Sequence, residues 1–263
     1  MRLDKYLSKT ILSSRSNAKE QIKKKNIYIN GKVVTSESFK VGDSDLVYLK
    51  KDDELILLEY EEYIYLMLNK PSGYVCANID NLHKTVFDLI PEYKERDLNC
   101  VGRLDLDTEG LLLLTDDGAF IHRVTSPKSN ISKKYYVEFE GVLDKNSEEK
   151  VSKGITLDDG SVTKPGHLEI LDKNKAYITI YDGKFHQVKR MFADLGTKVT
   201  YLKRVMIGKL DLDIECGKYK KLNIKDEFVT DIQITFANGE THTIYPQDIS
   251  RVASFIVSQH VTE

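Results

Sequence analysis

The segment Gly102-Arg103-Leu104-Asp105-Leu106-Asp107-Thr108-Glu109-Gly110 leads directly into four leucines, residues 111–114, which the turn Asp116-Asp117-Gly118 closes. Consecutive leucines bounded by turn residues predict a buried strand. A carboxylate in the loop before such a strand is a candidate for active-site chemistry, although most loop aspartates only cap turns. The residues alone leave both interpretations of Asp105 and Asp107 open. A glycosidase pair is disfavoured, because residues two apart in a loop seldom flank a sugar from opposite sides.

The hydropathy pattern divides the chain into three parts. Residues 1–58 predict two short helices and a β-hairpin, and the charged residues 50–54 and 59–62 indicate a linker. Residues 62–222 mix strands and helices too irregularly for a parallel βαβ fold, so we expect an α+β fold with a mixed, largely antiparallel sheet and flanking helices. Residues 223–263 form an acidic C-terminal extension of unknown role.

The second part carries the clearest secondary-structure signals. Strands are predicted at residues 63–68, 111–115, 135–139 and 176–181, and helices at residues 144–153 and 186–195. The helix at 186–195 has an apolar stripe at helical spacing that leaves Lys189 and Arg190 off the core face. In the extension, the pattern predicts a hairpin at Asn238-Gly239 and an amphipathic helix over residues 247–257.

Bulk composition excludes several classes of protein. The longest apolar run, residues 63–68, is far shorter than the ~18 residues of a membrane-spanning helix, and no signal-peptide pattern follows Met1. We therefore expect a cytoplasmic protein without a membrane partner, and a monomer. The 3 cysteines are scattered without metal-ligand spacing, which predicts reduced thiols and no structural metal.

The net charge of -2 hides two basic regions. Residues 1–32 hold 9 Lys and Arg against 2 acids, and residues 183–204 hold 6 against 1. Such local excess of positive charge indicates phosphate contacts, although a charge run is more often a solvated face. The candidates for contact with nucleic-acid phosphates on the two N-terminal helices are Arg2, Lys5, Arg15, Lys19, Lys23, Lys24 and Lys25.

The segment around Asp105 resembles the signature Gly-Arg-Leu-Asp-x-Asp-Thr-x-Gly-Leu of bacterial ribosomal RNA pseudouridine synthases. Three further motifs follow the order of that family. They are Asn69-Lys70-Pro71-Ser72-Gly73-Tyr74-Val75-Cys76, Lys133-Lys134-Tyr135 and Gly183-Lys184-Phe185-His186-Gln187-Val188-Lys189-Arg190-Met191-Phe192. Together they are most similar to the small-subunit pseudouridine synthase A group. Residues 1–58 resemble the RNA-binding domain of ribosomal protein S-four.

The resemblance implies a cofactor-free isomerase that converts uridine to pseudouridine in small-subunit ribosomal RNA, because the reaction involves no redox change. It implies that Asp105 is the catalytic carboxylate and that the Tyr135 ring lies against a uracil extruded from the RNA. Lys189 maps onto the basic residue of the site. Residues beside Asp105 or along the RNA path would be Arg103, Arg190, His186, Gln187 and Lys70. We also expect Lys70 and Pro71 to shape the floor of the cleft, because Pro71 restricts the backbone at both positions.

Several alternatives stay open. Tyr136 competes with Tyr135 for the place under the base, and Arg103, Lys189 and Arg190 compete for the place beside Asp105. The chain could also be an inactive RNA-binding or ribosome-assembly protein, or a synthase for large-subunit ribosomal RNA. The substrate could be free ribosomal RNA or a small-subunit assembly intermediate. Members of the family usually end near residue 219, whereas this chain has 263 residues.

Overall fold

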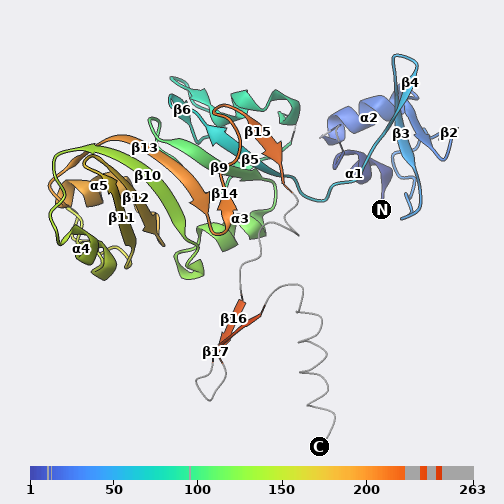
Figure 1. The fold of residues 1–263 in the computed structure, drawn as a ribbon. Helices are drawn as coiled ribbons and strands as arrows, with labels where there is room; N and C mark the ends of the chain where they lie inside the picture. Colours follow the sequence, from blue (N-terminus) through green and yellow to red (C-terminus); the bar gives the residue numbers. More distant parts are fainter. Residues whose placement is uncertain (11, 13, 95, 223–231, 236–240, 245–263) are drawn as a thin grey trace, which may run out of the picture.

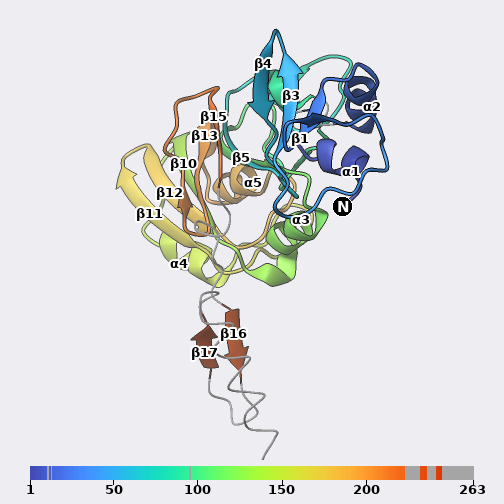
Figure 2. The ribbon, with the colours of Figure 1, turned by 90° about the vertical axis from the view of Figure 1, so that its right-hand side faces the viewer.

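The computed structural model describes residues 1–222 apart from 11, 13 and 95, together with residues 232–235 and 241–244 (Figure 1). Within these ranges no helix is long and apolar enough to cross a membrane. The turn predicted at Asn238-Gly239 and the helix predicted over residues 247–257 lie outside the described residues. Strands β16 (Ile232–Thr235) and β17 (Thr241–Ile244) pair antiparallel and lie apart from the large sheet in both ribbon views (Figures 1 and 2).

The N-terminal part contains two helices and a small curled sheet. Its elements are α1 (Leu3–Leu7), α2 (Arg15–Lys23), β1 (Ile27–Ile29), β2 (Lys32–Val33), β3 (Val47–Lys51) and β4 (Glu54–Leu57), with strand order β2-β1-β3-β4. The Ser14 hydroxyl caps α2 by accepting the Asn17 backbone N–H at 3.1 Å. Asn30 and Gly31 connect β1 to β2 in left-handed backbone conformations, as the hairpin prediction requires.

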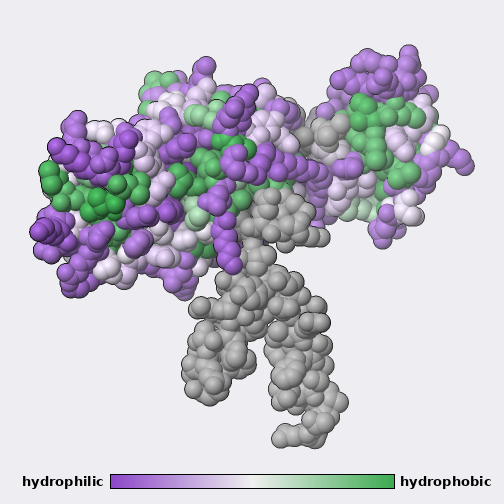
Figure 3. Space-filling model, in the orientation of Figure 1, coloured by the Kyte–Doolittle hydropathy of each residue, from purple (hydrophilic) through white to green (hydrophobic). Residues whose placement is uncertain are grey.

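The linker predicted at residues 50–54 is wrong. Strands β3 and β4 pair antiparallel across this stretch, and Asp52 and Asp53 form the turn with positive φ angles of 49° and 65°. Aspartate tolerates this conformation better than most residues, which is why a charged stretch can close a hairpin here. Strand β4 leaves Leu55, Ile56 and Leu57 exposed, and Figure 3 shows hydrophobic surface over this part of the N-terminal unit.

A large mixed sheet organises the second part, with strand order β11-β12-β10-β13-β9-β5-β15 and with β14 and β8 attached to β13 and β9. Its strands are β5 (Tyr65–Lys70), β8 (Asn99–Cys100), β9 (Glu109–Thr115), β10 (Lys133–Glu140), β11 (His167–Asp172), β12 (Lys175–Ile180), β13 (Lys198–Ile207), β14 (Leu210–Asp211) and β15 (Tyr219–Lys221). Only the contact between β13 and β9 is parallel among the described pairs of this sheet. The predicted α+β fold with a largely antiparallel sheet is confirmed.

Helices and a small ribbon complete this part. They are α3 (Gly118–Thr125), α4 (Ser147–Lys153), α5 (Gln187–Asp194), the 3-10 helices η1 (Val86–Leu89), η2 (Pro91–Tyr93) and η3 (Pro127–Ser129), and the parallel pair β6 (Tyr74–Val75) and β7 (Lys84–Thr85). Strand β9 is buried on both faces, because Leu112 and Leu114 join the core under α5, whereas Leu111 and Leu113 join the core under α3. The four leucines therefore fix the strand that follows Asp105 in the middle of the sheet.

A charged cluster joins the N-terminal unit to the large sheet. The Asp116 carboxylate accepts hydrogen bonds from Lys9 Nζ at 3.0 Å and from the buried Arg96 Nε at 2.9 Å. Arg96 also donates to the backbone oxygen of Glu61 at 2.9 Å. Because these contacts are partly buried, they hold the connection between the two units more firmly than surface ion pairs would.

Candidate active site

Lys70 anchors the loop that carries Asp105. Its side chain is fully buried, and its ammonium group donates to the backbone oxygens of Pro71, Asp105, Leu106 and Thr108 at 2.7 to 3.2 Å. Burial lowers the pKa of Lys70. The expected contact between Lys70 and RNA is therefore wrong for this conformation: the side chain shapes the floor of the site from inside the protein.

Asp105 lies beside two side chains of the motif at residues 183–192. Its carboxylate is 3.3 Å from Lys189 Nζ and 3.6 Å from His186 Nε2, and 29% of its side chain is exposed. Lys189 also contacts the Asp107 carboxylate at 2.6 Å. Burial lowers the pKa of Lys189, but the hydrogen bond that Lys189 donates to Asp107 and the charge of Asp105 outweigh it and raise that pKa. Lys189 therefore stays protonated at neutral pH and places a positive charge beside the Asp105 carboxylate.

Arg190 points away from Asp105 and forms ion pairs with Asp158 and Asp159. Of the candidates for the place beside Asp105, Arg190 does not take it, because consecutive residues of a helix project about 100° apart and Lys189 is the one that faces the loop. Arg103, the third candidate, is exposed and lines the same pocket. Among the described residues, Lys189 is the lysine or arginine that forms an ion pair with Asp105.

Tyr135 belongs to the pocket and Tyr136 to the opposite face of β10. The Tyr135 ring is 7% exposed and lines the pocket. Tyr136 donates its hydroxyl to Glu138 at 2.7 Å and packs edge-on against Tyr177 and Tyr201. The alternation of side chains along a strand separates the two tyrosines, and this structure places Tyr135 near the candidate carboxylate.

Arg204 is a pocket residue that the sequence did not single out. It is 2% exposed, donates to the Leu111 backbone oxygen at 2.7 Å, and lies 3.5 Å from the Tyr135 hydroxyl. No ion pair joins Arg204 to a carboxylate among the described residues, and its Nη2 atom has no hydrogen-bond partner there. A buried guanidinium without a counter-ion is costly, which makes a role in the site the better explanation than a role in stability.

Gly110 brings Arg204 to this place. Strands β9 and β13 run parallel with Gly110 opposite Arg204, and a Cβ atom at position 110 would lie 2.2 Å from the Arg204 backbone oxygen. The φ angle of Gly110 is +104°, which disfavours other residues independently of the contact. The last glycine of the central motif is thus needed for close approach of two strands.

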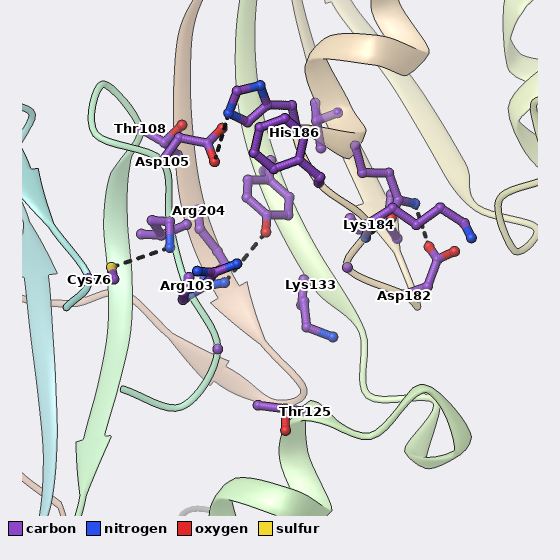
Figure 4. A pocket seen from close by; sticks show the side chains of 18 of the residues that line it. Cys76, Arg103, Asp105, Thr108, Thr125, Lys133, Asp182, Lys184, His186 and Arg204 are labelled. Atoms are coloured by element: carbon purple, nitrogen blue, oxygen red, sulfur yellow. Dashed lines mark hydrogen bonds and ion pairs between the residues drawn. The ribbon is translucent and has the colours of Figure 1, made fainter. Parts of the chain in front are cut away.

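The pocket is a cavity of about 540 Å³ between β10, β13 and the two motif loops. Asp105 and His186 lie at one end and Lys133 and Thr125 at the other, with Arg103 and Arg204 between them (Figure 4). Burial and, next, the charge of Arg204 lower the pKa of Lys133 to about 8. Positive side chains therefore dominate the wall opposite Asp105, which suits a phosphate-bearing substrate.

Comparison with known proteins identifies the family of this chain. Residues 64–194 match the model of the RNA pseudouridylate synthase family, and residues 1–47 match the S4 domain. A ribosomal small subunit pseudouridine synthase A from Haemophilus influenzae is 43% identical over 225 residues, which cover 84% of this chain and 96% of that protein. The chain belongs to the RNA pseudouridylate synthase family.

Other relatives agree with this assignment. The Escherichia coli K12 protein of the same name is 38% identical over 226 residues, covering 84% of this chain and 96% of that protein. A solved structure titled as a pseudouridylate synthase aligns with a TM-score of 0.60 and 41% identity, over 86% of this chain and 97% of that one. The pseudouridylate synthase fold and the N-terminal S4 domain, both expected from the motifs, are confirmed.

Gln187 makes its hydrogen bonds within the protein and holds the loop before α5 in place. Its side chain is 4% exposed, donates to the Asp182 carboxylate and accepts the Lys184 backbone N–H at 2.7 Å. Gln187 still belongs to the pocket lining, so its contact with RNA stays a prediction. The burial arises because Gln187 begins α5 on the side that faces the core.

Two thiols adjoin the pseudouridylate synthase loop. Cys76 lines the pocket, and its sulfur accepts the Leu104 backbone N–H at 3.4 Å. A hydrogen bond from the Cys100 thiol lowers the pKa of Cys76. Among the described residues, no group of three or more His, Cys, Asp and Glu side chains is arranged to hold a metal ion.

The basic residues of the S4 domain lie on its surface. Arg2, Lys19 and Lys24 form ion pairs with Asp4, Glu37 and Glu20 respectively. All seven N-terminal candidates for RNA contact are exposed: Arg2, Lys5, Arg15, Lys19, Lys23, Lys24 and Lys25. Exposed ion pairs of this kind contribute little to stability, so these cations remain accessible to phosphate.

Proposed function

We propose that this protein converts one uridine of small-subunit ribosomal RNA to pseudouridine, with Asp105 as the catalytic carboxylate. The observation that carries the proposal is the pairing of Asp105 with Lys189 at 3.3 Å, in a pocket that also holds Tyr135. The relatives named as small-subunit synthases support the choice of RNA. Ribosomal RNA also fits the S4 domain at the N-terminus.

The chemistry follows from the groups in the pocket. The Asp105 carboxylate either bonds to the ribose or takes a proton from it, and the bond between the ribose and the uracil N1 breaks with its electron pair on the uracil. The uracil turns and bonds to the ribose through C5, which releases the carboxylate from the ribose or returns the proton it took. C5 then loses its proton and N1 gains one. The Tyr135 hydroxyl helps to remove the C5 proton, and Lys189 holds the Asp105 carboxylate in position.

RNA delivery is the task of the exposed cations. Phosphate contacts by the N-terminal helices position the RNA, and Arg103 and His186 meet the nucleotide at the pocket. The target uridine reaches Asp105 by extrusion, at a cost of a few kcal/mol for unstacking. We propose residues 1–58 as the RNA-binding domain, residues 62–222 as the catalytic domain and residues 223–263 as an extension. A single chain supplies the complete site, so we propose a monomer that acts in the cytoplasm.

Asp105→Asn tests the proposal. We expect the variant to bind small-subunit ribosomal RNA as the unaltered chain does and to lose product formation by about 10³-fold or more. Pseudouridines would be mapped in ribosomal RNA from cells with and without the gene, and then in purified RNA and assembly intermediates treated with each protein. Pseudouridine formation by Asp105→Asn at the normal rate would refute the role of Asp105.

The mapping also separates the alternatives. A pseudouridine that disappears from large-subunit RNA would make the protein a large-subunit synthase. Unchanged pseudouridines in both RNAs, with slower subunit assembly in cells lacking the gene, would make it an assembly protein. Modification of an assembly intermediate but not of free RNA would identify the particle as the substrate.

A further inference from the structure

Phe185 presents a bare aromatic ring at the rim of the pocket. Its side chain is 71% exposed although it is apolar, and the residue lines the same cavity as Asp105. A phenylalanine contributes little to stability in this position, because most of its apolar area stays in water. Its place in the pocket lining makes the exposed ring available to stack on a nucleobase.

One face of this ring is already covered. The rings of Phe185 and His186 are stacked, with centroids 3.7 Å apart and an interplanar angle of 21°. His186 in turn directs its Nε2 atom toward the Asp105 carboxylate at 3.6 Å (Figure 4). The free face of Phe185 is therefore connected to the catalytic carboxylate through a single intervening ring.

The backbone that carries Phe185 is firmly held. Gln187 binds the Lys184 backbone N–H, Arg190 donates to the Phe185 backbone oxygen at 3.3 Å, and His186 takes a left-handed conformation with φ of 49° as it caps α5. A rigid backbone under an exposed ring means that little conformational freedom is lost when a ligand covers the ring. The Phe185 ring is therefore held in place before a ligand covers it.

We propose that Phe185, backed by His186, is a stacking platform for the nucleobase next to the extruded uridine. Extrusion leaves the neighbouring base without its stacking partner, and an aromatic side chain can replace that partner for any base. Arg103 and Lys184 line the same pocket as Phe185 and suit the phosphates of the same nucleotides. The proposal rests on the RNA-modifying function and names how the site holds its substrate.

The test measures binding of a short RNA that contains the mapped target uridine. Dissociation constants would be determined in Asp105→Asn chains, so that no product forms, with Phe185 retained or changed to Ala, Leu or Tyr. We expect Phe185→Ala to weaken binding by about 5- to 150-fold, the range for loss of one base stack. Phe185→Tyr keeps the ring and should bind within about 2-fold of the parent, whereas Phe185→Leu should resemble Phe185→Ala.

Abasic RNAs identify the base concerned. Two RNAs would lack the base on the 5′ or the 3′ side of the target uridine. Removing the stacked base should weaken binding to the parent chain but not further weaken binding to Phe185→Ala. Val142→Ala, which changes a side chain that is 72% exposed and lies outside the pocket lining, is the matched control and should leave every constant unchanged.

Two results would overturn the platform. They are binding by Phe185→Ala or Phe185→Leu equal to that of the parent, and an abasic effect that persists in full in Phe185→Ala. Thermal unfolding of each variant checks that the fold is intact, as the exposure of Phe185 leads us to expect. Failure of the chain with Asp105 intact to form pseudouridine in this RNA would instead contradict the proposed function, because the platform is judged from binding alone.

Discussion

The ammonium group of Lys70 lies 3.0 Å from the backbone oxygen of Asp105, so that a fully buried cation holds the loop of the proposed catalytic carboxylate. Lys70→Met would leave four backbone oxygens without this donor. We expect a loss of about 2–4 kcal/mol of unfolding free energy and a much slower reaction, because the loop would no longer be fixed. Urea unfolding and single-turnover rates measure both effects.

Lys145→Met is the matched control for Lys70→Met, because it removes an exposed lysine of the same domain. Its stability and rate should equal those of the unaltered chain. A Lys70→Met protein as stable and active as this control would show that the loop keeps its shape without the buried cation.

Arg204 is expected to act through Tyr135, whose hydroxyl is 3.5 Å from the guanidinium. Tyr135→Phe and Arg204→Gln should each slow the reaction, and the double variant should be little slower than the worse single variant, because coupled residues are not additive. With a substrate deuterated at the uracil C5, both single variants should show a larger isotope effect than the unaltered chain. If the rate losses of the two single variants add up in the double variant, Arg204 does not act through Tyr135. Lys203→Gln, one position earlier on β13, is the control.

Lys133 gives a prediction about pH. Its pKa is lowered to about 8, so its positive charge is lost from the folded protein as pH rises through about 8. RNA affinity should fall between pH 7 and pH 9, and this fall should be smaller in Lys133→Gln. Binding measured at constant ionic strength tests it, and equal pH dependence of the two chains would assign the effect to another group.

Whereas RNA affinity should fall as pH rises, the contribution of Lys133 to the free energy of unfolding should increase. The unfolded chain keeps the Lys133 proton up to its ordinary pKa of 10.5, whereas the folded chain releases it from about pH 8. The unfolded state therefore binds more protons in this window, and the contribution of Lys133 to unfolding free energy rises with pH. The difference in unfolding free energy between the unaltered chain and Lys133→Gln should follow this rise.

Gly110→Ala is expected to destabilise the protein by about 2–5 kcal/mol, since the new Cβ would meet the backbone of Arg204 and the φ angle is positive. Chemical unfolding measures the loss. In the control Gly118→Ala, no atom lies within 4 Å of the added Cβ and the residue begins α3, so its stability should be equal or slightly greater. Equal stability of the two variants would contradict the close approach of β9 and β13.

A chain that ends at Asn223 is expected to fold and to modify RNA. The buried clusters of the described residues reach Leu222, whose backbone N–H binds the Tyr65 oxygen at 2.8 Å. The shortened protein would be compared with the full chain by circular dichroism and by pseudouridine formation. Loss of folding would make the extension part of the core.

The sequence by itself determined the features that depend on local pattern and on the order of motifs. Four leucines predicted the buried strand after Asp105, and the stripe on α5 predicted its core face. The alternation along β10 put Tyr135 and Tyr136 on opposite faces, and the structure decided which of them faces the pocket. The motif order around Asp105 indicated the family, which the comparisons confirmed. These patterns can be read from the sequence without knowing which segments contact one another in the fold.

Only the tertiary structure decided the partners of these residues. Lys189 and Arg190 are neighbours in sequence, but the direction of α5 sends one to Asp105 and the other to Asp158. The sequence suggests that Lys70 and Pro71 shape the cleft floor, but only the fold shows that the carbonyl oxygens of a loop some 35 residues away surround the Lys70 ammonium. Arg204 enters the site because Gly110 lets β13 approach β9, a contact between strands distant in sequence that no local pattern records.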